Sequence, residues 1–137
     1  RSRGLGDVYK RQMQTLAKEV KQFTTAKMDP MEIFDEACVV ARSAVDQYMQ
    51  GKEEPMYCGF ANISIHPARG TFVSWCKKNE IGSNGYGGGW RISYYDFMGN
   101  HKYSHTQSMD IKEVAMDAVS KYLKSLGMTA YSESRAD

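Results

Sequence analysis

The segment Asn84-Gly85-Tyr86-Gly87-Gly88-Gly89-Trp90 places four glycines around one tyrosine. Glycine is required where the backbone adopts a positive φ or where another group approaches the main chain closely. The flanking residues 71–78 and 90–97 alternate in hydrophobicity, as half-buried strands do. The segment is therefore predicted to connect two neighbouring strands of an antiparallel sheet.

The same glycine-rich segment has a functional interpretation. Consecutive free N–H groups in such a loop form a nest that binds anions, and Tyr86 or Trp90 would then stack on a base. The alternative is a flexible hairpin connection without a ligand. A Walker A loop is excluded because no Gly-Lys-Ser/Thr follows, and a dinucleotide fingerprint is excluded because a strand is expected after the loop.

Two further strands are predicted on the outer sides of this pair. Residues 57–66 alternate, with Ala61, Ile63 and Ile65 directed to one face and polar side chains to the other. Residues 102–107 form a polar fourth strand after a tight turn at 99–100. The predicted sheet is antiparallel and four-stranded.

Helices are predicted before and after the strands. One begins with Asp29 as N-cap, Pro30 in the first turn and Glu32 completing a capping box, and it stops at Gly51. The last helix has Asp110 as N-cap and stops at Gly127. A weaker helical pattern covers residues 13–27. The predicted fold is α+β, in the order α-α-β-β-β-β-α, with the helices on one face of the sheet.

Length and composition favour one soluble globular domain. The chain has 137 residues, 42% hydrophobic and 25% charged, with a formal net charge of +2. That charge is too small to indicate nucleic acid binding by itself. Three scattered cysteines fit free thiols in a reducing cytosol better than a disulfide framework or a zinc site. No apolar run reaches the length of a membrane span, and no signal peptide is visible.

The two ends of the chain are expected to lie outside the domain. Residues 1–12 resemble translated sequencing-adaptor read-through in a metagenomic reading frame, which would make Met13 the native start. The alternative is a basic arm that binds nucleic acid. Residues 13–128 are predicted to form the single domain, and 129–137 a frayed polar tail.

The sheet face opposite the helices is the predicted binding surface. It would carry hydrogen-bonding groups together with aromatic rings, a mixture that recognises a polar, planar ligand, and arginines near the strand ends would meet phosphate. A solvated outer face and an oligomer interface are the alternatives. The predicted ligand-binding residues are Asn62, Ser64, His66, Arg69, Tyr86, Trp90, Arg91 and Tyr95.

Catalysis has weaker support in the sequence. His66, His101 and His105 are candidates for acid–base chemistry on a phosphodiester, but no carboxylate cluster accompanies them, and no cofactor or metal is expected. Double-stranded RNA binding is also disfavoured. The position where such domains carry a lysine cluster, at the start of the last helix, holds Lys112 among Asp110, Glu113 and Asp117. Single-strand binding by stacking on Trp90, Tyr94, Tyr95 and Phe97 stays open as an alternative, although the small net charge counts against it.

In its size, its aromatic and glycine-rich loop and its lack of a catalytic motif, the chain resembles small phage anti-defence proteins that sequester immune nucleotides. The resemblance implies a non-catalytic, oligomeric protein of the host cytosol that binds a cyclic nucleotide or a cyclic ADP-ribose-like signal. Tyr86 and Trp90 would stack on bases, and Arg69 and Arg91 would contact phosphates. The alternatives are a protein–protein inhibitor or structural phage protein that binds a host protein, and a histidine-dependent phosphodiesterase.

Overall fold

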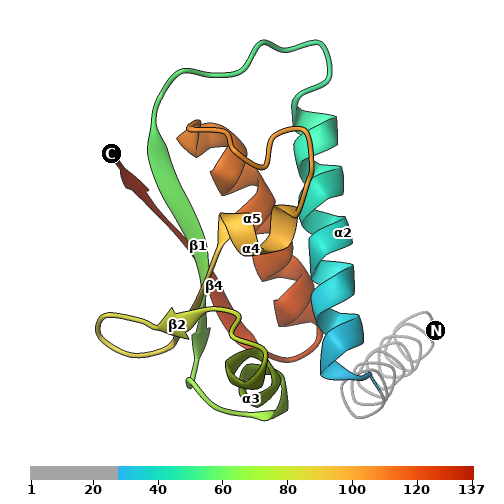
Figure 1. Ribbon diagram of the computed structural model, residues 1–137, viewed down its shortest axis with the longest axis vertical. Helices are drawn as coiled ribbons and strands as arrows, with labels where there is room; N and C mark the ends of the chain where they lie inside the picture. The colour runs from blue at the N-terminus through green and yellow to red at the C-terminus, as the bar shows by residue number, and fades with distance from the viewer. Residues whose placement is uncertain (1–27) are drawn as a thin grey trace, which may run out of the picture.

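A computed structural model describes residues 28–137 of the chain, as four helices and four strands (Figure 1). The elements in chain order are α2 (Pro30–Tyr48), β1 (Gly59–His66), α3 (Thr71–Lys78), β2 (Ser83–Asn84), β3 (Trp90–Ser93), α4 (Tyr94–Met98), α5 (Met109–Ser125) and β4 (Thr129–Ala136). The strands form one antiparallel sheet in the order β2-β3-β1-β4. The predicted α+β class and four-stranded antiparallel sheet are confirmed.

The core lies between the sheet and the two long helices. Figure 1 shows α2 and α5 side by side on one face of the sheet. Helix α2 presents Ala37, Ala41 and Val45 at intervals of four residues, so that they share one buried stripe. The sheet contributes Ile63 from β1 and Ile92 from β3, which are paired in register and fully buried. The predicted direction of the apolar side chains on residues 57–66 is confirmed.

The predicted element order is wrong at two segments. Residues 71–78, expected as a strand, form α3, because Phe72, Val73 and Cys76 are buried together on one side of a helix. Residues 102–107, expected as the fourth strand, form turns. A short amphipathic run fits both periods, so the period alone did not distinguish helix from strand.

The fourth strand is instead β4, which was expected to be a frayed tail. All eight of its residues pair with β1, from Thr129 opposite His66 to Ala136 opposite Gly59. Ala130 is fully buried and its carbonyl accepts a hydrogen bond from Ser120 Oγ on α5, at 3.1 Å. Because β4 is an edge strand, most of its residues stay exposed, which explains its polar sequence.

Helix boundaries also differ from the predicted ones. Asp29 is the N-cap of α2 as predicted, but α5 is capped by Ser108 and not by Asp110. The predicted strand 90–97 ends at Ser93, because Ser93 and Asp96 form a capping box that starts α4. The predicted leader 1–12 and the predicted helix 13–27 lie outside the described residues.

Candidate functional site

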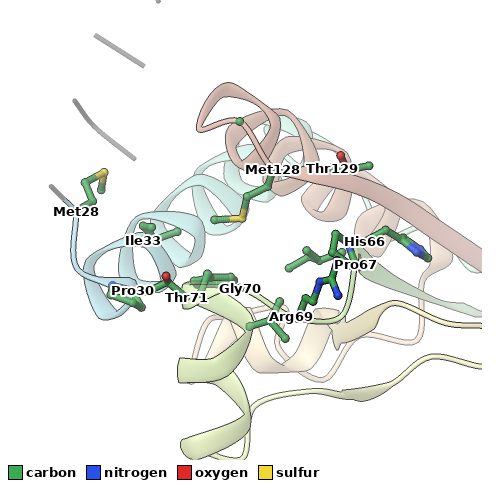
Figure 2. A pocket seen from close by; sticks show the side chains of 14 residues that line it. Met28, Pro30, Ile33, His66, Pro67, Arg69, Gly70, Thr71, Met128 and Thr129 are labelled. Atoms are coloured by element: carbon green, nitrogen blue, oxygen red, sulfur yellow. The ribbon is translucent and has the colours of Figure 1, made fainter. Parts of the chain in front are cut away.

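A cavity of about 480 Å³ opens where β1 leaves the sheet, between the N-terminal ends of α2 and α3 and the start of β4 (Figure 2). Figure 2 shows Ile33 and Met128 on one side of the cavity, and Pro67 and Arg69 on the other. Its lining consists of Met28, Pro30, Ile33, Ile65, His66, Pro67, Arg69, Gly70, Thr71, Phe72, Val73, Gly127, Met128 and Thr129.

Most of the cavity wall is apolar. Ile33 from α2, Ile65 from β1 and Phe72 from α3 are core residues whose surfaces border the cavity. Met128, in the short connection between α5 and β4, covers the same space. The volume lies within the range of small-molecule sites, which are typically apolar with few polar groups.

The polar end of the cavity is the start of α3. Gly70 is the N-cap, with φ of 112°, and no side chain caps the helix. The first N–H groups of a helix have no partner within the helix, and together with the helix dipole they attract anions. Arg69 is exposed next to them and forms no ion pair with any residue of 28–137. This end of the cavity is therefore suited to an anionic group.

On the opposite face of the sheet, four predicted site residues lie together, as expected. Ser64 of β1 is directly opposite Arg91 of β3, and Asn62 and His66 share its face. Ser64 Oγ and His66 Nε2 are 2.9 Å apart. Asn62 Nδ2 donates to Glu133 Oε1 at 2.9 Å, and Arg91 Nε lies 3.7 Å from the same oxygen. We call this surface the polar face.

The glycine-rich loop folds back onto the polar face. Gly85 N–H donates to the Gly89 carbonyl at 2.9 Å, and Gly88 N–H donates to the Gly85 carbonyl at 3.2 Å. A side chain at Gly89 would place its Cβ 2.6 Å from His66 Cε1 and 2.9 Å from Ser64 Oγ. Two loop N–H groups are thus used internally, and Gly89 is required by its contact with β1.

The three predicted aromatic site residues are separated from one another. Trp90 is only 7% exposed, and its Nε1 donates to the Ile81 carbonyl at 3.0 Å, so the predicted stacking role of Trp90 is wrong. Tyr86 is fully exposed at the loop. Tyr95 lies in α4, where its hydroxyl accepts a hydrogen bond from Lys112 Nζ at 2.7 Å.

The predicted site therefore divides into two. Arg69 belongs to the cavity, whereas Asn62, Ser64 and Arg91 belong to the polar face. His66 connects them, because it borders the cavity while its ring is hydrogen-bonded to Ser64. Figure 2 shows the His66 side chain directed away from Ile33 and Met128.

Sequence reasoning missed the contributions of the last strand and of the segment before it. Met128 and Thr129 border the cavity, and Tyr131 and Glu133 lie on the polar face opposite Ser64 and Asn62. Small and large side chains alternate from 129 to 136, and this alternation could have indicated a strand. The polarity of the segment favoured the interpretation as a tail instead.

The histidines are not arranged for shared catalysis. His101 Nε2 is 2.7 Å from Asp46 Oδ1 and its Nδ1 accepts from Tyr103 N–H, so both ring nitrogens are engaged. Asp46 lies sixteen residues along α2 from Pro30, which borders the cavity near His66. At 1.5 Å per residue, Asp46, the partner of His101, lies about 24 Å along α2 from Pro30. Among residues 28–137, no group of three His, Cys, Asp or Glu side chains could hold a metal.

Comparisons with protein-family models, with curated proteins and with solved structures gave no match. No helix within residues 28–137 is long and apolar enough to cross a bilayer.

Proposed function

We propose that this protein binds a small nucleotide-type ligand in the cavity at the start of α3 and does not turn it over. The observation that carries the proposal is one cavity that combines an apolar wall with an arginine and an uncapped helix N-terminus. A nucleotide has the matching composition, an apolar planar base joined to an anionic phosphate. Sequestration of a signalling nucleotide, as by phage anti-defence proteins, is the role proposed for this binding.

The phosphate would lie at the α3 end of the cavity. The guanidinium of Arg69 would donate charge-assisted hydrogen bonds, and the first N–H groups of α3 would supply further donors. Thr71, the first residue of α3, adds a hydroxyl at the same place. The base would contact the apolar wall near Met128 and Ile33.

The composition of the lining supports binding without chemistry. Among the described residues that border the cavity there is no carboxylate, thiol or amine. The single histidine, His66, uses Nε2 to contact Ser64 on the opposite side of the sheet. General acid–base catalysis needs a group within hydrogen-bond reach of the reacting atoms that can exchange a proton, and a guanidinium group is not suited to that role.

Native mass spectrometry with a panel of linear and cyclic nucleotides tests this proposal. We expect a complex of unchanged nucleotide mass and a loss of affinity of at least about tenfold in Arg69→Ala, since one charge-assisted contact is worth about 1.5–3 kcal/mol. Lys78→Ala, at the other end of α3, is the matched control and should bind like the parent. A shortened nucleotide, or equal binding by Arg69→Ala, contradicts the proposal.

A further inference from the structure

The polar face carries exposed aromatic rings that the proposed nucleotide site does not use. Phe60 and Tyr131 on this face are 40% and 50% exposed, and Tyr95, in the helix α4 that follows β3, is 41% exposed. Phe60 lies on β1 on the same face as Asn62, and Tyr131 lies on β4 opposite Ser64. Large exposed rings gathered on one sheet face indicate a surface that contacts another molecule.

Two of these rings are held in place by a buried ammonium group. Lys112 of α5 is fully buried, and its Nζ donates to the Gly59 carbonyl and to the Tyr95 hydroxyl, both at 2.7 Å. The same Nζ lies 5.0 Å from the ring centroid of Phe60 and 4.8 Å from that of Tyr95. Rings fixed in this way lose little conformational freedom when a flat molecule stacks on them.

The rings on β1 and β4 are spaced along the sheet. Phe60 is four residues from Ser64, or about 13 Å along the strand, and Tyr131 is beside Ser64 on the neighbouring strand at about 5 Å. A flat surface with rings this far apart suits an extended polymer better than a single small molecule. Four-stranded sheets that bind single-stranded RNA stack successive bases on such rings.

Positive charge follows the same path. Arg135 lies opposite Phe60, with its guanidinium carbon 5.7 Å from the ring centroid. Arg91 lies opposite Ser64, and its Nε forms an ion pair with Glu133 Oε1 at 3.7 Å. Lys124 Nζ is 5.6 Å from the ring centroid of Tyr131. Glu133 is the acidic side chain between them, and it already accepts from Asn62.

We propose that the polar face binds single-stranded nucleic acid. Bases stack on Phe60 and Tyr131, while Arg91 and Arg135 contact the phosphates. Base stacking on aromatic side chains together with a positively charged track is how proteins bind single strands without sequence preference. This activity goes beyond the proposed nucleotide binding and uses other residues.

Fluorescence anisotropy of the full chain with labelled twelve-nucleotide oligothymidylate and oligouridylate tests the proposal. We expect binding that weakens with salt. Tyr131→Ala should weaken it at least about fivefold, the lower bound for losing one stacked base. Tyr131→Phe, which keeps the ring, should bind like the parent. Arg135→Ala should reduce the slope of log affinity against log salt concentration by about 0.7, the value for one phosphate contact on a single strand. Lys78→Ala should leave that slope unchanged.

Four results would overturn the proposal. The first is no oligonucleotide binding by a folded protein, and the second is equal affinity of Tyr131→Ala and the parent. The third is loss of oligonucleotide binding in Arg69→Ala, which would place the strand in the cavity. The fourth is a dimer, seen by light scattering, that Tyr131→Ala dissociates and oligonucleotide does not, since the polar face would then belong to a second copy. Failure of the mononucleotide experiment leaves these outcomes unaffected, because Arg69 lies off the polar face.

Discussion

At the scale of single residues, Lys112 shows how a charged side chain becomes part of the interior. Its Nζ donates hydrogen bonds to two oxygen atoms and contacts two aromatic rings, all from β1 and α4. These contacts lie at the end of the sheet where β1 is not paired with β3. A buried ammonium group is tolerated only when it is hydrogen-bonded in this way. The sequence placed Lys112 among acidic neighbours on a helix surface, and only the fold brought it to Gly59 and Tyr95.

Lys112→Met should therefore destabilise the protein. Methionine fills a similar volume but donates no hydrogen bond, so it leaves the Gly59 carbonyl without this donor. We expect the free energy of unfolding in urea to fall by about 1–3 kcal/mol, the cost of an unsatisfied buried polar group. Lys78→Met, at an exposed position, should change it by less than about 0.5 kcal/mol. Equal stability of the two variants would show that the contacts of Lys112 contribute nothing.

At the scale of elements, the start of α3 is the part of the fold most closely tied to the proposed function. Thr71→Glu introduces a carboxylate at the first helical position, where the dipole stabilises negative charge by about 0.3–1 kcal/mol. The same carboxylate would repel a phosphate. We expect a small gain in thermal stability together with loss of nucleotide binding, measured by calorimetry.

Thr71→Gln is the matched control for this substitution, because it has nearly the same size without the charge. It should retain most of the affinity and show no gain in stability. Nucleotide binding by Thr71→Glu at the parental level would mean that the phosphate does not lie at the N-terminus of α3.

A second prediction at the scale of elements concerns β4. Deletion of residues 129–137 removes eight residues paired with β1 and exposes the part of α5 that covers Ala130. We expect the free energy of unfolding to fall by more than about 3 kcal/mol, well beyond the range of changes at a frayed end. Hydrogen exchange of the intact chain should show protected amides in β4. Unchanged stability after the deletion would restore the polar-tail interpretation.

At the scale of the whole molecule, two buried thiols link stability to pH. Burial raises the pKa of Cys38 to about 11 and that of Cys76 to about 12, whereas a thiol in the unfolded chain titrates near 8.5. Below that pH both states carry the protons, so the two thiols do not make stability depend on pH. Between about pH 8.5 and 11 the unfolded state loses protons that the folded state keeps, and stability falls as pH rises.

We expect each thiol to contribute a loss of up to about 1.4 kcal/mol per pH unit in that window. Urea unfolding at pH 7, 9 and 10 measures the slope, and Cys76→Ala should reduce it. Cys58→Ala should leave it unchanged, because Cys58 is exposed. If Cys76→Ala does not reduce the slope, the loss of stability at alkaline pH comes from other groups.

In the whole molecule, the cavity and the polar face lie next to each other. His66 has the cavity on one side of the sheet and Ser64 on the other. The sequence grouped Arg69 with Asn62, Ser64 and Arg91 because all lie in or near predicted strands. The structure separates Arg69 from them because the chain turns at Pro67 and enters α3 on the helix side of the sheet.

The sequence by itself determined the features that depend on neighbours along the chain. The Asp29 cap and the apolar stripe of α2, the alternation of β1 and the α+β class follow from local periods and capping. Only the tertiary structure decided which segments pair. β4 has too few buried side chains to show a hydrophobic pattern, so its place beside β1 comes from backbone hydrogen bonds and from contact with α5. The cavity likewise exists only because α2, α3 and β4, far apart in the chain, converge at one end of the sheet.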